Sequence, residues 1–79
     1  MKINVLAFGI VKEILGTNHL VIDFEGNSSE DLKDSLEKQF PRLMQLPTYM
    51  LAVNNEYVLN NTAINSNDEI AIIPPVSGG

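Results

Sequence analysis

Apolar and polar residues alternate along three stretches of the chain, with the period of two that is typical of β-strands. These stretches are residues 2–8, 19–25 and 69–73. A further strand region, residues 50–59, is divided by the turn formers Asn54 and Asn55 and predicts two short strands. The pattern therefore predicts a sheet whose strands come from both ends of the chain.

Two other stretches repeat their apolar residues every three to four positions, as helices do. The clearer one spans residues 28–40: Ser28 is a favoured N-cap, acidic residues occupy the first turn, and Pro41 ends the pattern. The weaker one spans residues 10–15 and stops at Gly16. The order strand, strand, helix, strand, strand predicts an α+β fold in which one main helix crosses a mixed sheet, with a short extra helix after the first strand.

The first and last strands are apolar on both faces. If the main helix covers one face, we expect Leu6, Phe8 and Ile73 to lie on the other as an exposed apolar patch. A patch of this kind marks a contact site for another protein. The alternative is that the short helix 10–15 or the loop 41–49 covers these side chains.

Composition narrows the possible functions. The 79 residues are enough for one domain, and ten acidic against five basic side chains give a net charge of −5. Nucleic acid and membrane surfaces are poor partners for such a chain, because both are anionic. Cysteine is absent and His19 is the single histidine, which excludes a thiolate metal site and a Cys/His nucleophile pair. The N-terminal segment loses its apolar character too early for a signal peptide, and we expect a cytoplasmic protein.

The acidic residues of the main helix have a structural interpretation. They are Glu30, Asp31, Asp34 and Glu37. Because the helix dipole favours acids near its N-terminus, we interpret them as a solvated face that attracts a basic partner. Tyr49 and Tyr57 have no surrounding pattern that indicates a function.

The chain ends in the sequence PPVSGG. Pro74 and Pro75 lack amide donors, so they end the hydrogen-bonded ladder and keep the chain extended. We therefore predict a domain of residues 1–73 and a tail of residues 74–79. Residues 76–79 reach about 13 Å when extended. Since the last two are glycines, the tail suits a channel too narrow for other residues.

The terminal carboxylate of Gly79 is the reactive group of this tail. It is ionised at neutral pH and is a weak nucleophile towards the α-phosphate of ATP. No part of the sequence resembles a phosphate-binding loop, so activation requires a separate nucleotide-binding enzyme. The chain is then the substrate of that enzyme.

Three segments resemble one known family. They are DEIAIIPPVSGG at residues 68–79, INVLAFGIVKEILG at residues 3–16 and LAVNNEYV at residues 51–58. All three are similar to the small, sulfur-carrying subunits of molybdopterin synthase, the MoaD-like proteins, and together they span nearly the whole chain. The resemblance implies the ubiquitin-like β-grasp fold, which agrees with the predicted order of elements.

The resemblance also implies a reaction cycle. An E1-like adenylating enzyme uses ATP to form an acyl-adenylate on Gly79, and sulfur from a persulfide converts this to a thiocarboxylate. The tail then inserts into the large synthase subunit and donates sulfur to cyclic pyranopterin monophosphate. The resemblance implies that Gly79 bears the sulfur and that Gly78 keeps the tail narrow. The part of the tail that is threaded into the partner then consists of Pro74, Pro75, Val76 and Ser77.

The same resemblance assigns the partners. Leu6, Phe8 and Ile73 become a docking surface for the adenylating enzyme and the large subunit in turn. Two small subunits flank a dimer of large ones, which makes a heterotetramer. Catalytic residues are expected on the partners, and this chain itself binds no cofactor and no metal.

Three other functions remain open from the sequence. A sulfur carrier for thiamin synthesis shares the fold and the Gly-Gly end, but such chains do not normally carry PPVSGG. A ubiquitin-like modifier would join Gly79 to lysines of other proteins. A β-grasp interaction module, whose glycines are incidental, would keep its activity when Gly79 is deleted, whereas a carrier or a modifier would lose it.

Overall fold

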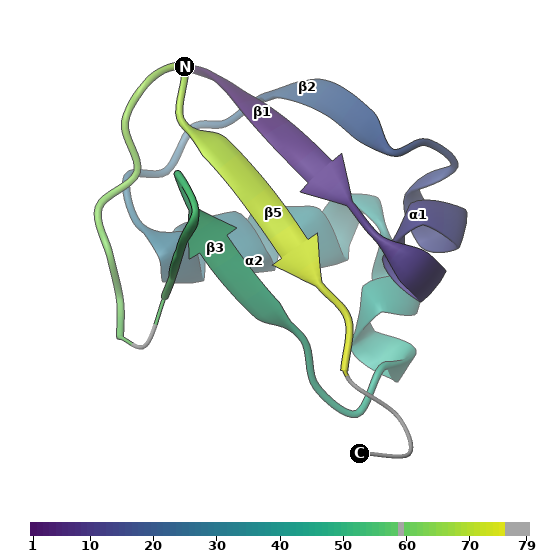
Figure 1. Cartoon of the computed structure of the whole chain (residues 1–79). Coiled ribbons are helices and arrows are strands. Elements are labelled where there is room, and N and C mark those ends of the chain that lie inside the picture. Colours follow the sequence, from purple (N-terminus) through teal and green to yellow (C-terminus); the bar gives the residue numbers. More distant parts are fainter. Residues whose placement is uncertain (59, 76–79) are drawn as a thin grey trace.

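The computed structural model of the protein describes residues 1–58 and 60–75. The chain forms one mixed β-sheet with its helices packed against a single face (Figure 1). The elements, in chain order, are β1 (Lys2–Ala7), α1 (Gly9–Leu15), β2 (His19–Asp23), α2 (Ser29–Gln39), the 3₁₀ helix η1 (Pro41–Gln45), β3 (Met50–Val53), β4 (Glu56–Tyr57) and β5 (Glu69–Ile73). The predicted α+β fold is confirmed.

The five strands of the sheet follow the order β2-β1-β5-β3-β4. β1 and β5 are parallel neighbours, with Val5 opposite Ile70 and Ala7 opposite Ile72. β2 pairs antiparallel with β1, and β3 pairs antiparallel with β5. Parallel neighbours need a long crossover, and the segment that contains α2 is part of it. The two ends of the chain thus meet side by side within the sheet.

Local sequence signals set several element boundaries. Ser28 Oγ accepts a hydrogen bond of 3.3 Å from the amide of Asp31 and caps α2, as predicted. Asn54 and Asn55 have φ angles of 49° and 72°, the left-handed conformation that a tight hairpin turn requires. Gly16, which follows α1, has a φ of 80° and donates its amide to the last turn of that helix. Each of these boundaries depends on residues close to it in the chain.

The segment after α2 differs from its prediction. α2 ends at Gln39, in agreement with the stop expected from Pro41. The sequence predicts a loop over residues 41–49, whereas residues 41–45 form the 3₁₀ helix η1. Proline fits the first turn of a helix, because the amide hydrogen that it lacks has no partner there. Pro41 therefore ends one helix and begins the next.

The core lies between the inner face of the sheet and the helices. Its residues are Ile3, Val5, Ala7, Val11, Leu15, Ile22, Phe24, Leu32, Leu36, Leu43, Tyr49, Leu51, Ile64, Ile70 and Ile72. Within the described part of the chain, every buried side-chain nitrogen or oxygen has a hydrogen-bond partner. The buried polar side chains of the described core thus find their partners within the chain itself.

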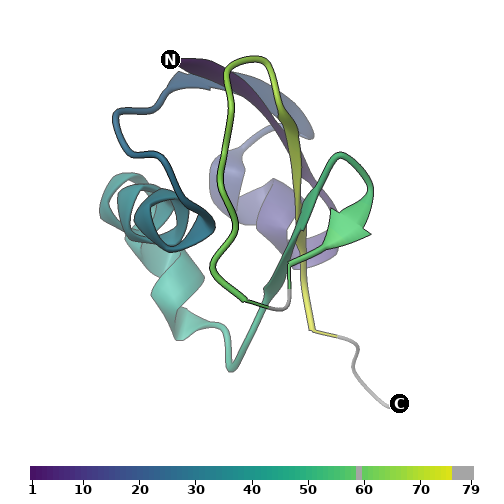
Figure 2. The same ribbon diagram turned by 90° about the vertical axis from the view of Figure 1, so that its left-hand side faces the viewer.

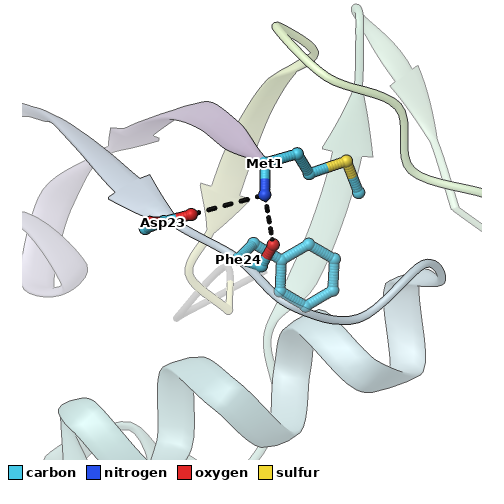
Figure 3. A network of polar contacts seen from close by, with 3 residues as sticks. All are labelled: Met1, Asp23 and Phe24. Atoms are coloured by element: carbon cyan, nitrogen blue, oxygen red, sulfur yellow. Dashed lines mark hydrogen bonds and ion pairs between the residues drawn. The ribbon is translucent and has the colours of Figure 1, made fainter.

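Hydrogen bonds tie the start of β1 to the end of β2 (Figure 3). The amino group of Met1 donates to the backbone carbonyl of Phe24 at 2.8 Å and to Asp23 Oδ1 at 3.3 Å. The contact with Asp23 is the one ion pair in the described residues, and this carboxylate is 72% exposed, so it adds little stability. The amide of Phe24 donates to the Met1 carbonyl at 2.7 Å. These bonds extend the pairing of β1 with β2 beyond the strands themselves.

Candidate functional site

The outer face of the sheet is open, because α1, α2 and η1 all pack against the inner face (Figure 2). A row of apolar side chains crosses it from β1 to β4. Leu6 of β1 lies opposite Ala71 of β5. Ala71 lies opposite Ala52 of β3, which in turn lies opposite Tyr57 of β4. The open face is therefore apolar across four neighbouring strands of the sheet.

The three residues predicted for the docking patch lie where β1 and β5 end. Phe8 follows β1 and is 48% exposed, and Leu6 and Ile73 are partly exposed. With about half of its surface in contact with solvent, Phe8 is not covered by α1 or by the segment 41–49. Its binding role stays a prediction.

Two further side chains extend this surface beyond the prediction. Met50 is 42% exposed and lies opposite Ile73, and Tyr57 is 60% exposed. Alternation along residues 50–58 shows which side chains share a face, but only the pairing of β3 with β5 places Met50 beside Ile73. We refer to Leu6, Phe8, Met50, Tyr57 and Ile73 as the outer patch.

A hollow of about 440 Å³ lies at the β1 end of the outer patch. It is lined by Leu6, Ala7, Phe8, Gly9, Lys12, Asn18 and His19. Lys12 and His19 are exposed, and Lys12 places one cationic side chain at the edge of the hollow, on a chain whose net charge is −5. An apolar side chain with an acidic neighbour fits this combination.

The predicted tail begins beside the outer patch. Pro74 follows β5 directly, and both Pro74 and Pro75 are partly buried. A Cβ placed on Gly9, the first residue of α1, would lie 3.3 Å from Pro74 Cγ. The remaining tail residues, Val76, Ser77, Gly78 and Gly79, lie outside the described residues. Their roles, and the division of the chain after residue 73, stay predictions.

Tyr49 joins the segment before β3 to α2. Its hydroxyl donates a hydrogen bond to the carboxylate of Glu37, and the ammonium of Lys33 lies 4.9 Å from the centre of its ring. Burial raises the pKa of Tyr49, and the hydrogen bond to Glu37 and its negative charge raise it further. Tyr49 therefore stays protonated at neutral pH and serves as a structural link. Nothing next to Tyr49 in the sequence indicates this contact, because it needs the docked helix.

The other acidic residues of α2, Glu30, Asp31 and Asp34, are exposed, as predicted. The described ranges contain no group of His, Cys, Asp or Glu side chains that could hold a metal ion. No helix within residues 1–58 and 60–75 is long and apolar enough to cross a membrane. The outer patch, next to the start of the tail, is the strongest feature for a function.

The sequence profile of the ThiS family matches residues 5–79. The chain belongs to the ThiS family. One relative is the molybdopterin synthase sulfur carrier subunit of Dictyostelium discoideum, which is 42% identical over 83 residues. This alignment covers 99% of the present chain and 96% of the relative. Similarity within the ThiS family therefore includes both the domain and the C-terminal sequence.

Solved structures similar to this ThiS family member share its fold. The crystal structure of SAMP1 from Haloferax volcanii matches with a TM-score of 0.82 and 25% identity, over 100% of both chains. A chain in the complex of subunits 1 and 2 of molybdopterin-converting factor from Helicobacter pylori matches with a TM-score of 0.71 and 28% identity, again over 100% of both chains. The predicted ubiquitin-like β-grasp fold is confirmed.

Proposed function

We propose that this chain is the sulfur carrier subunit of a molybdopterin synthase and acts in molybdenum cofactor biosynthesis. The observation that carries the proposal is the place where the tail begins: Pro74 follows β5 directly, beside the exposed outer patch. A partner that docks on the patch is thereby brought next to the segment that leads to Gly79. The relative from D. discoideum, which aligns along almost the whole chain, is named for the same function.

The proposed cycle begins at the carboxylate of Gly79. One of its oxygens attacks the α-phosphorus of ATP on an E1-like adenylating enzyme, pyrophosphate leaves, and an acyl-adenylate forms. This mixed anhydride turns a poor electrophile into one that a sulfur nucleophile can attack. The terminal sulfur of a persulfide then attacks the carbonyl carbon and AMP leaves. A thiol reduces the resulting acyl disulfide and releases the thiocarboxylate.

Sulfur transfer occurs on the large subunit. The tail enters this subunit with the thiocarboxylate leading, and its sulfur attacks cyclic pyranopterin monophosphate. Water then cleaves the bond between the transferred sulfur and the Gly79 carbonyl, which restores the carboxylate. Two such transfers make the dithiolene of molybdopterin. The residues that catalyse these steps lie on the partners, and this chain binds no cofactor of its own.

The outer patch is the proposed docking surface for both partners. Its apolar side chains remain in contact with water in the free chain, and a partner that covers them gains the free energy of their burial. The adenylating enzyme and the large subunit use the patch in turn, since each must receive the same tail. Two carriers on a dimer of large subunits form a heterotetramer. We place the cycle in the cytoplasm, where ATP is available.

The first test is the mass of the protein purified from its own cells, together with the mass of the C-terminal fragment that contains Gly79. Exchange of one oxygen for sulfur adds almost the same mass as oxidation of a methionine. The gain must therefore be located on the tail and not on Met1, Met44 or Met50. We expect it on Gly79; a tail that stays unmodified beside its activating enzyme, ATP and a persulfide donor contradicts the proposal.

A ubiquitin-like modifier is the second candidate. The observation that favours it is the similarity to SAMP1 of H. volcanii and to the small archaeal modifier protein 1 (SAMP1) of Methanosarcina acetivorans, which matches with a TM-score of 0.80 and 26% identity. Both functions begin with the same adenylation of Gly79. Peptides in which Gly79 is joined to a lysine of another protein would establish the modifier, and their absence from cells that contain the thiocarboxylate would leave the carrier alone.

A further inference from the structure

Directly after β5, the chain contacts a segment that is distant in the sequence: Pro74 lies against Gly9. β1 and β5 run parallel, with Ala7 opposite Ile72. Gly9 comes two residues after Ala7, and Pro74 comes two residues after Ile72. These two residues are also close: a Cβ at Gly9 would lie 3.3 Å from Pro74 Cγ. Because glycine has no side chain, the proline ring lies directly against its backbone.

Two separate conditions favour glycine at this position. Gly9 has a φ of +54°, in the left-handed region that residues with a side chain rarely adopt. This conformation turns the chain from β1 into α1 within one residue, and the carbonyl of Phe8 immediately accepts hydrogen bonds from the amides of Val11 at 3.0 Å and Lys12 at 3.4 Å. The space above Gly9 is also occupied by Pro74. The first condition concerns the fold of the domain, and the second concerns the tail.

The contact is important because the tail begins with two prolines. Neither Pro74 nor Pro75 has an amide hydrogen with which to continue the ladder to β1 or β3. Without these donors, packing of the proline rings takes a larger part in setting the direction of the chain after Ile73. Pro74 is partly buried, and Gly9 contributes the surface against which its ring lies.

We propose that Gly9 is a positioning residue for the C-terminal tail. Its bare backbone seats the ring of Pro74 and sets the direction in which the chain leaves β5 at Pro74 and Pro75, beside the outer patch on which a partner docks. The functional half of this inference rests on the proposed sulfur-carrier function; the structural half, a coupling between Gly9 and the tail, does not.

The chain offers a matched control. Gly9 and Gly16 stand at the two ends of α1, and both have positive φ angles, +54° and +80°. A Cβ at Gly16, however, meets nothing within 4 Å. Gly9→Ala and Gly16→Ala therefore add the same methyl group to the same kind of backbone, and only the first pushes against Pro74.

The first measurement is made on the free protein without any partner. Amide chemical shifts of residues 76–79 are recorded by nuclear magnetic resonance for the wild type, for both alanine variants and for Gly9→Ala combined with Pro74→Ala. We expect both single variants to lose thermal stability, whereas only Gly9→Ala moves the tail amides. Pro74→Ala removes the Cγ that would lie 3.3 Å from the new methyl group, so that in its background Gly9→Ala moves the tail amides little. Tail amides that respond equally to Gly9→Ala and Gly16→Ala overturn the proposal.

The second measurement is sulfur transfer with the adenylating enzyme and the large subunit. Misplacement of a reacting group by about 1 Å costs up to about 100-fold in rate. We expect Gly9→Ala to lower the turnover number of sulfur transfer by about tenfold relative to Gly16→Ala, in line with a smaller displacement. A double-mutant cycle of Gly9→Ala with Pro74→Ala should be non-additive, because the two changes act through one contact. Equal turnover of the two glycine variants, or an additive cycle, overturns the positioning role.

A second pair of variants keeps the test open if Gly9→Ala does not fold. Asparagine tolerates the left-handed region better than alanine, so Gly9→Asn and Gly16→Asn relieve the backbone strain and keep the tight contact with Pro74 at only one end of α1. Failure of the proposed function is recognised separately: a wild-type chain that never gains sulfur rejects the carrier, while the tail amide shifts still decide whether Gly9 seats Pro74.

Discussion

The two faces of the sheet are made by the same strands and differ in what covers them. In β5, Ile72 points to the inner face and is fully buried, whereas its neighbour Ile73 points to the outer face and is partly exposed. Val5 and Leu6 repeat this contrast in β1. Helices bury the inner side chains, and that burial stabilises the domain by about 25 cal/mol per Å² of apolar surface. Because side chains alternate along a strand, one residue stabilises the core and the next stays exposed for contact with a partner.

The largest expected effect comes from the last residue of the chain, Gly79. Deletion of Gly79 should abolish thiocarboxylate formation and sulfur transfer, because the reacting carboxylate is then displaced by one residue. The free energy of unfolding should stay within about 0.5 kcal/mol of the wild type. Mass spectrometry of the C-terminal fragment and urea denaturation check the two parts. A chain without Gly79 that still supports molybdopterin formation would contradict the carrier function.

The next largest effect is a difference in stability between substitutions on the two faces of one strand, β5. Ile72→Ala should lower the free energy of unfolding by about 2–5 kcal/mol, because it leaves a cavity in the closed core. Ile73→Ala, the matched change on the open face, should cost less than about 1 kcal/mol. Urea denaturation of both variants measures the difference. Equal losses would mean that the outer face is as buried as the inner one.

A charge on the outer patch should affect binding more than stability. Phe8→Asp should weaken association with the large subunit by at least about tenfold, which corresponds to about 1.4 kcal/mol, while the melting temperature changes little because Phe8 is 48% exposed. Isothermal titration calorimetry measures the affinity. Val21→Asp is the control: Val21 is 53% exposed and lies in β2, outside the outer patch. A large loss of stability in Phe8→Asp would place Phe8 in the core instead.

The smallest expected effect concerns the link between Tyr49 and α2. Tyr49→Phe removes the hydrogen bond to Glu37 and should cost about 1 kcal/mol at pH 7. The pKa of Tyr49 is raised in the folded chain. As the pH rises above about 10, tyrosine ionises first in the unfolded chain, so the wild type loses this part of its stability.

Urea denaturation of the wild type and Tyr49→Phe between neutral and alkaline pH measures this dependence. The difference between the two proteins should shrink as the pH rises through that range. A difference that stays constant over this pH range would show that folding does not raise the pKa of the Tyr49 hydroxyl.

Much of the fold follows from short-range signals. The last strand occupies residues 69–73, as its alternation predicts, and Asn54 with Asn55 forms the predicted turn. Ser28 caps α2 as its position before an acidic first turn indicates. These predictions succeed because the free energy of a cap or a turn depends on a few residues that are neighbours in the chain. The 3₁₀ helix at residues 41–45 was missed, because Pro41 both ends a helix and suits the start of another.

The candidate site also contains residues that the sequence predicts and a residue that only the structure places. Alternation and the PPVSGG sequence are enough to select Leu6, Phe8, Ile73 and the tail as its predicted parts. Met50 enters the outer patch only through its position opposite Ile73. Side chains that come from distant strands become neighbours through the register of the sheet, which no local pattern specifies.

By itself, the sequence determined the strand regions, the two ends of α2 and the chemistry of the C-terminal carboxylate, since each depends on the identity of neighbouring residues. Tertiary structure alone decided which face stays open and that Pro74 lies against Gly9, which is far from it in the chain. The physical reason is that burial and close packing arise between elements. Their outcome depends on how the parallel pairing of β1 with β5 brings the two ends of the chain together.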